Sequence, residues 1–205
     1  RLNTLKDFMA CFLYVAGPLL LILAQPDLGT SLVFIAIMFG MMLVAGANPK
    51  LLGILFFGGL ALIVAVLWLH FNLGLELPLK EYQIMRLVVF LDPYADGENG
   101  LGHGYNIIQS LVAVGSGGIW GKGLFNGTQG QLNFLPYHHT DFIFSVIGEE
   151  LGFVGSMFIL IFSFALLYSA LRIALQAKDL YGALLVTGVV SMFTFHILEN
   201  VGMAI

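Results

Sequence analysis

The chain alternates long uncharged apolar runs with shorter polar segments. Five runs contain no charged residue: Phe8 to Pro26, Leu28 to Pro49, Leu51 to Leu75, Leu151 to Leu171 and Leu180 to Leu198. An apolar run of roughly 18 residues or more is long enough to cross the hydrocarbon core of a bilayer as a helix. The pattern therefore predicts five membrane-spanning helices, at about residues 8–25, 30–47, 51–72, 142–171 and 180–205.

Composition agrees with a membrane protein. Hydrophobic residues make up 59% of the 205 residues and charged residues only 10%, whereas a soluble domain has about a quarter of its residues charged. The formal net charge of −4 gives no basic surface of the kind that nucleic acid requires, so that class of partner is set aside. We expect an all-α fold, a polytopic transmembrane helical bundle forming a single domain over residues 1–205.

The basic residues predict which way the helices cross the membrane, because short loops rich in lysine and arginine stay on the cytoplasmic side. Basic residues precede the first span, lie between the second and third, and lie between the fourth and fifth: Arg1 and Lys6, Lys50, and Arg172 with Lys178. The long loop over residues 73–141 is then extracytoplasmic.

This loop is glycine-rich but also carries many apolar side chains, which favours an ordered segment over a disordered linker. Within it, Tyr105 to Val114 is expected to form a short amphipathic helix on or in the membrane surface, and Gly115 to Gly118 are expected to end it.

Three acidic residues gather near one end of the fourth predicted span. Asp141 opens the span, and Glu149 and Glu150 lie about two turns further along the helix. Aspartate and threonine are favoured helix caps, so the simplest interpretation is that Asp141 or Thr140 caps this helix. Ionisable side chains inside a span are costly and usually face a cavity or a partner, which leaves a functional role equally open for the two glutamates.

Other polar residues outside the spans are weaker candidates. Asp27 lies in a Pro-Asp-Leu-Gly segment typical of a tight turn. Lys122 lies among glycines and could approach a phosphate as a point charge, although a solvated loop lysine is the simpler alternative. His138, His139 and Asp141 offer metal-ligating atoms, but their spacing is not diagnostic of a metal site.

Four motifs occur in order along the chain: AQPDLGTS from Ala24, YNIIQS from Tyr105, GSGG from Gly115 and HTDFIF from His139. Together they resemble the shape, elongation, division and sporulation (SEDS) family, which contains RodA, FtsW and SpoVE. The segment GTQGQLNFLP from Gly127 is more similar to RodA, the elongation member, than to FtsW, the division member. The resemblance covers nearly the whole chain.

The resemblance implies a fold of ten spanning helices, of which this chain supplies the fifth to the ninth. The first four spans, a glycine- and proline-rich motif and the last helix are then expected to lie outside this sequence. A multi-pass position in the bacterial cytoplasmic membrane is implied, with the active site on the extracytoplasmic side and a class B penicillin-binding transpeptidase as partner.

The resemblance also implies an enzyme, a peptidoglycan glycosyltransferase that polymerises lipid II and releases undecaprenyl pyrophosphate. Asp141 matches the essential acid of the family and is expected to be the general base, oriented by His139 and Thr140. Lys122, or a divalent cation (Mg²⁺ or Mn²⁺) with no ligands assigned, is expected to meet the charge of the leaving pyrophosphate. Second-rank candidates for shaping the substrate cavity are Asp27, Glu149 and Glu150.

Two other functions remain open from the sequence. A flippase for the lipid-linked precursor would also use buried acids and a mobile glycine-rich segment, but it needs polar groups at the bilayer midplane. The strongest polar cluster here is predicted at one surface, which favours the polymerase. A non-catalytic scaffold for the transpeptidase is the third possibility, and it predicts that replacement of Asp141 is tolerated.

Overall fold

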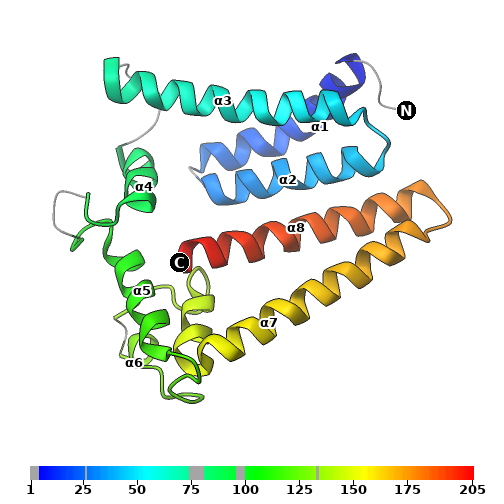
Figure 1. Ribbon diagram of the computed structural model, residues 1–205. Helices are drawn as coiled ribbons and strands as arrows, with labels where there is room; N and C mark the ends of the chain where they lie inside the picture. The colour runs from blue at the N-terminus through cyan, green and yellow to red at the C-terminus, as the bar shows by residue number, and fades with distance from the viewer. Residues whose placement is uncertain (1–4, 26, 74–80, 96–99, 133) are drawn as a thin grey trace. The chain divides into compact units, whose positions relative to one another are not determined.

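The computed structural model describes residues 5–25, 27–73, 81–95, 100–132 and 134–205, and within them all regular structure is helical. The helices, seen in Figure 1, are α1 (Leu5–Ala24), α2 (Leu28–Val44), α3 (Pro49–Leu73), α4 (Glu81–Leu91), α5 (Tyr105–Gly117), α6 (Thr128–Gln131), α7 (Ile143–Leu175) and α8 (Leu180–Ala204). The all-α prediction is confirmed. Each of the five predicted spans falls on one helix, namely α1, α2, α3, α7 or α8.

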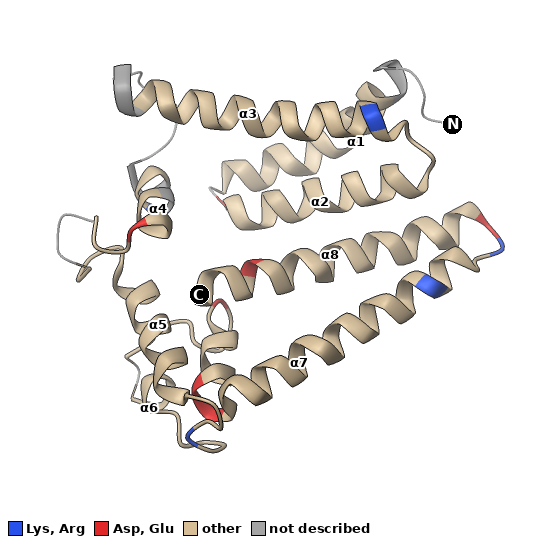
Figure 2. Cartoon of the chain, in the orientation of Figure 1, with Lys and Arg blue, Asp and Glu red and all other residues tan. Residues whose placement is uncertain are grey.

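Several helices suit a membrane. Among the described residues, three segments are long and apolar enough to cross one: Pro49–His70 in α3, Ile143–Leu175 and Leu180–Ala204. Shorter apolar stretches lie in the first two helices, Phe8–Ala24 and Leu28–Val44. Figure 2 shows that the long helices are uncharged over most of their lengths, with charged residues mainly near helix ends and turns. The chain is a membrane protein, while the count of five spans and their sidedness stay predictions.

The chain divides into two compact units, which are described separately. The first contains α1, α2 and α3 together with Leu166–His196 of α7 and α8. Phe8 of α1, Met38 and Met42 of α2 and Leu52 of α3 form its buried core. Helices α1 and α2 run side by side in opposite directions (Figure 1). Apolar side chains at helical spacing therefore hold the first three helices together.

Small residues bring α2 close to α8 within the first unit. Gly40 lies directly against Ser191, and a side chain at Gly188 would meet the sulfur of Met41 at 3.3 Å. Glycine at such a contact lets two helix backbones approach closely, as is common between membrane helices.

The second unit contains α4, α5 and α6 with the first part of α7 and the last residues of α8. A buried hydroxyl pair joins three of these elements, because the Oγ atoms of Ser110 in α5 and Ser145 in α7 are 2.6 Å apart. The Ser110 hydroxyl also lies 3.2 Å from the carbonyl oxygen of Ala204, at the end of α8. A helix end has carbonyl groups without intrahelical partners, and Ser110 satisfies one of them.

The structure confirms the short helix predicted from Tyr105. It continues to Gly117, three residues beyond the predicted end, and stops where Gly118 adopts φ 59°. The long loop was expected to carry short amphipathic helices, but the bounds of α4 and α6 were not predicted. The single turn of α6 is too short to show an apolar periodicity in the sequence. Its first residue, Thr128, binds Glu149 of α7.

Candidate functional site

Helix α7 is interrupted at Gly152, whose backbone adopts φ 68° and ψ −169°. In an unbroken helix the N–H groups of Phe153 and Val154 would bond to carbonyl oxygens four residues earlier. They donate instead to the carbonyl oxygens of Gly118 and Ile119, at 2.9 and 3.1 Å. The loop that follows α5 therefore takes the place of the preceding turn of the helix.

The same loop also satisfies the two carbonyl groups that the interruption frees. The N–H of Lys122 donates to the carbonyl oxygen of Glu149 at 3.0 Å, and the N–H of Gly123 donates to that of Glu150 at 2.9 Å. Non-helical backbone at membrane depth is tolerated only where its polar groups find partners within the protein. Four loop-to-helix hydrogen bonds thus replace two helical ones, and they fix the loop against the acidic residues.

Glu149 is fully buried, and among the described residues its carboxylate is bound by that loop and by α6, which follows it. Its Oε1 lies 2.6 Å from Nζ of Lys122 and accepts from both the N–H and the hydroxyl of Thr128 at 2.8 Å. The N–H of Gln129 lies 3.2 Å from Oε2. A buried carboxylate is costly unless it is paired and hydrogen-bonded, and here it is both.

Glu150 reaches the same loop from the next position of α7. Its Oε2 accepts from the N–H of Phe125 at 3.1 Å. Gly127 packs against both acids, because a Cβ atom there would lie 3.0 Å from Oε1 of Glu150 and 3.1 Å from Oε2 of Glu149. Both glutamates thus face a partner within the protein, the segment between α5 and α7, and their predicted role in shaping a substrate cavity stays a prediction.

Lys122 is not a solvated loop lysine, so the simpler of the two sequence interpretations is wrong. Its side chain is 28% exposed, and Nζ bridges Glu149 to the hydroxyl of Thr128, 3.0 Å away. The charge of the lysine is balanced by the carboxylate of Glu149. Its predicted contact with a phosphate stays a prediction.

We expect Glu149→Gln to destabilise the second unit. The substitution leaves Lys122 without its counter-charge and places an amide N–H₂ among N–H donors, which should lower the free energy of unfolding by about 2–3 kcal/mol. Glu150→Gln is the matched control, because Glu150 is half-buried and bonds to one described N–H, so its effect should stay below about 1 kcal/mol. Unfolding in detergent measures both, and equal effects would contradict the assigned role of the buried pair.

Asp141 lies on a closed turn just before α7, with its side chain exposed. The carbonyl oxygen of Tyr137 accepts from the N–H groups of Thr140 and Asp141, both at 3.1 Å, and of Phe142 at 3.3 Å. Tyr137 has φ 55°, a left-handed conformation that is uncommon for a non-glycine residue and often occurs at functional sites. The turn therefore presents the carboxylate of Asp141 from an ordered backbone.

The neighbours of Asp141 on this turn have different surroundings. His139 is exposed and meets the ring of His138 edge-on, with the ring centroids 5.1 Å apart. The exposed Thr140 directs its hydroxyl to the carbonyl oxygen of Tyr137 at 3.3 Å. Neither contact reaches the carboxylate of Asp141, so orientation of Asp141 by His139 and Thr140 stays a prediction.

Asn200 of α8 contacts the same turn and was missed by the sequence reasoning. Its Nδ2 donates to the carbonyl oxygen of Thr140 at 3.0 Å, and its Oδ1 accepts from the N–H of Phe144 at 3.1 Å. The N–H of Phe144, in the first turn of α7, is thus bound by Asn200 and not by Asp141 or Thr140. The interpretation that Asp141 or Thr140 caps the helix is therefore wrong at this position. A polar Asn in a mostly apolar span was the available signal.

Asp27 belongs to the first unit and caps α2. Its Oδ1 accepts from the N–H of Thr30 at 3.1 Å and its Oδ2 from the hydroxyl of the same residue at 2.7 Å. The segment predicted as a tight turn thus joins α1 to α2 and ends in the cap of α2, and a role of Asp27 in binding substrate stays a prediction.

The candidate residues of the second unit fall into two groups. Lys122, Glu149 and Glu150 form one cluster, while His139, Thr140 and Asp141 share the turn before α7. No hydrogen bond or ion pair between described residues joins the carboxylate of Asp141 to the cluster. Over the described part of the chain, no three His, Cys, Asp or Glu side chains converge as a metal site would require, so no residues are assigned to the expected divalent cation.

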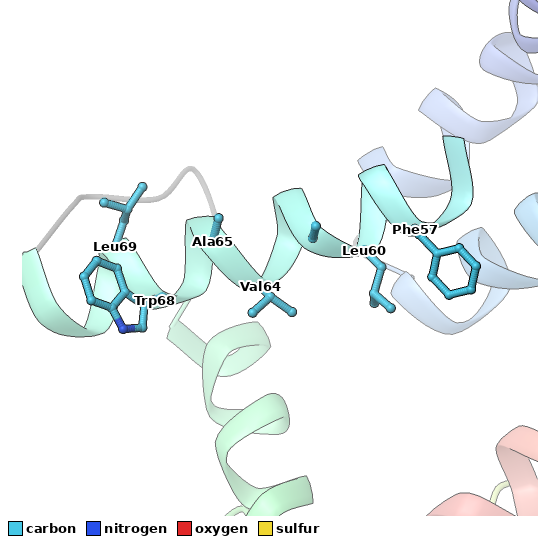
Figure 3. A pocket seen from close by; sticks show the side chains of 7 residues that line it. Phe57, Leu60, Val64, Ala65, Trp68 and Leu69 are labelled. Atoms are coloured by element: carbon cyan, nitrogen blue, oxygen red, sulfur yellow. The ribbon is translucent and has the colours of Figure 1, made fainter. Parts of the chain in front are cut away.

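An open apolar hollow lies elsewhere, along one face of α3. Its lining residues, drawn in Figure 3, recur every three or four positions: Phe57, Leu60, Ala61, Val64, Ala65, Trp68 and Leu69. None of the candidate polar residues lines it. An apolar face of this kind suits contact with lipid or with another helix.

Comparison with known proteins covers the whole chain. Residues 1–205 match the family described as cell cycle protein, FtsW/RodA/SpoVE. The chain is 37% identical over 200 residues to peptidoglycan glycosyltransferase MrdB of Escherichia coli K12, covering 98% of the chain and 51% of that protein. It is 39% identical over 197 residues to stage V sporulation protein E of Bacillus subtilis, covering 96% and 50%.

Relatives with other roles match about as well. Identity is 33% over 264 residues to peptidoglycan glycosyltransferase RodA of Treponema pallidum, covering 97% of the chain and 60% of that protein. Identity is 38% over 189 residues to the probable peptidoglycan glycosyltransferase FtsW of Aeromonas salmonicida, covering 90% and 44%. The chain thus spans about half the length of the curated relatives it matches, and the identities do not separate RodA from its sister groups.

A solved structure agrees with the sequence comparisons. One chain of a peptidoglycan synthase complex that coordinates polymerization and crosslinking superposes with a TM-score of 0.70 at 30% identity, covering 98% of this chain and 52% of that one. With the family match over every residue and a helical membrane fold, this protein belongs to the FtsW/RodA/SpoVE family.

Proposed function

We propose that the protein containing this chain is a peptidoglycan glycosyltransferase that polymerises lipid II at the outer face of the bacterial cytoplasmic membrane. The observation that supports it most is Asp141, an exposed carboxylate on an ordered turn at the beginning of a helix long enough to cross the membrane. Membrane-anchored lipid II would bring its sugars to such a boundary while its hydrocarbon tail stays among the lipids.

In the proposed reaction the carboxylate of Asp141 accepts the proton of an acceptor sugar hydroxyl. The hydroxyl oxygen forms a bond to the anomeric carbon of the donor, and the bond from that carbon to the pyrophosphate oxygen breaks. Undecaprenyl pyrophosphate leaves with the bonding electron pair. A general base contributes most when it is held within hydrogen-bond reach of the proton that it takes, and the closed turn supports this requirement.

The cluster around Glu149 supports the same site by fixing the loop. Lys122 is partly exposed and is paired with Glu149, which offsets its charge. We therefore propose that Lys122, Glu149 and Glu150 chiefly fix the shape of the expected substrate cavity. Because Glu149 offsets its charge, Lys122 should contribute less to binding the leaving phosphate than an unpaired lysine would.

We further propose a role in cell elongation, with a class B penicillin-binding transpeptidase as partner. The RodA-like segment that begins at Gly127 supports elongation, and this segment also packs against both glutamates. The similarity to one chain of a peptidoglycan synthase complex supports an assembly with a crosslinking enzyme.

A polymerisation assay in detergent micelles separates the proposed function from its alternatives. The full-length protein, with its transpeptidase partner inactivated by penicillin, is mixed with fluorescent lipid II, and we expect a ladder of glycan products on a gel. A flippase makes no product in micelles, because no second compartment exists, and a scaffold makes none either. The partner alone is the control. Absence of polymer, with lipid II movement across proteoliposomes, would establish the flippase and refute the proposal.

A further inference from the structure

Asn200 contacts the backbone on both sides of Asp141. It donates from Nδ2 to the carbonyl oxygen of Thr140, at the peptide bond that leads into Asp141, and accepts at Oδ1 from the N–H of Phe144, three residues beyond it. The contacts span 60 and 56 residues of sequence, so they fix the turn against a distant helix. We propose that Asn200 is a positioning residue, which holds the Asp141 carboxylate at the place where it can take the proton of the acceptor hydroxyl. This inference rests on the proposed function.

The two bonds suit an amide side chain. A backbone carbonyl only accepts and a backbone N–H only donates, so the side chain must offer one donor and one acceptor side by side. A carboxylate supplies only the acceptor, and an alanine supplies neither. This need also explains why a polar residue occupies a helix otherwise suited to lipid, where an amide without partners is costly.

A purely structural role, in which Asn200 only joins helices, does not explain its position. The buried Ser110 hydroxyl already connects α5 with α7 and with the end of α8, through Ser145 and the carbonyl oxygen of Ala204. These contacts do not involve the Asp141 turn. The bonds of Asn200 differ because one of them ends on that turn itself. Displacement of a reacting group by about 1 Å can cost about 100-fold in rate.

The test compares three variants of the full-length protein with its transpeptidase partner, using labelled lipid II and rates per folded molecule. For Asn200→Ala we expect kcat to fall by about 10- to 100-fold, while KM for lipid II stays within about twofold. Asn200→Asp keeps the bond from Phe144 and loses the one to Thr140, so its kcat should lie between wild type and Asn200→Ala. Ser110→Ala is the control, and it should lower the melting temperature but leave kcat per folded molecule unchanged.

The outcomes separate this inference from the function on which it rests. If Asn200→Ala loses activity only in proportion to its loss of folded protein, or raises KM at constant kcat, Asn200 is structural and the inference is wrong. If Asn200→Ala retains kcat while Asp141→Asn abolishes it, the positioning role of Asn200 is refuted and the general-base role of Asp141 stands. If Asp141→Asn polymerises lipid II normally, Asp141 is not the general base and the positioning role fails with it, whereas absence of polymer from the wild-type protein would refute the proposed function itself.

Discussion

Asp141→Asn should lower the rate of lipid II polymerisation by about 100-fold or more, because asparagine keeps the shape of the side chain but cannot take up the proton of the acceptor hydroxyl. The Asp141 side chain is exposed, and the hydrogen bonds that close its turn are made by backbone atoms, which the substitution leaves in place. The free energy of unfolding should therefore change by no more than about 0.5 kcal/mol. Polymer length on a gel and a melting curve measure the two effects.

Asp179→Asn is the matched control for this experiment. Asp179 accepts from the N–H of Gly182 at 3.0 Å at the start of α8, and asparagine caps a helix about equally well. The substitution Asp179→Asn makes the same chemical change outside the proposed active site. The variant should therefore polymerise lipid II at the wild-type rate. Full polymerisation by folded Asp141→Asn would show that Asp141 is not the general base and that another group takes up the proton.

Gly152→Ala should largely abolish the folded protein. Gly152 has φ 68° and ψ −169°, a region that is essentially restricted to glycine and costs other residues about 1–3 kcal/mol. A methyl group there would also lie 2.6 Å from the carbonyl oxygen of Ile119 and 2.7 Å from the carbonyl carbon of Trp120. These are backbone atoms held by the loop-to-helix hydrogen bonds, so they cannot move without breaking those bonds. The combined cost should exceed about 3 kcal/mol.

Gly115→Ala is the control, because Gly115 lies in α5 with open space around its Cα hydrogen. Alanine is favoured over glycine inside a helix by about 1 kcal/mol, so this variant should be as stable as wild type or slightly more stable. Size-exclusion chromatography in detergent and thermal unfolding distinguish the two variants. If they behave alike, the loop is not docked into the interruption of α7.

Hydrophobic pattern alone predicted the positions of the long helices, because burial in lipid requires a continuous apolar run. It did not predict the interruption of α7. The run that begins at Leu151 marks the apolar part of the span, yet the helix begins at Ile143 and includes the acids as well. Gly152 appears in the sequence as one of several glycines in apolar surroundings, and only the backbone dihedral angles distinguish it from them.

The candidate site could be predicted only as far as local signals reach. Ionisable residues within a span pointed to Glu149 and Glu150, and the structure gives both of them partners. Their contacts could not be read from the sequence, because Lys122 lies 27 residues from Glu149 and nothing local specifies the pairing. The same holds for Asn200, which is 60 residues from Thr140. Contacts of this length depend on tertiary packing.

The interruption of α7 also defines a segment of helix whose length can be compared with the thickness of a bilayer. From Gly152 to Arg172 the helix advances by 20 residues, or about 30 Å at 1.5 Å per residue, which is about the thickness of the hydrocarbon layer. The predicted sidedness would place Arg172 among the inner head groups, and a segment of this length is then expected to end near the outer head groups. Inserting one helical turn between Gly152 and Arg172 would lengthen this segment by about 5 Å, so its length is expected to set the height of the proposed site relative to the lipid head groups.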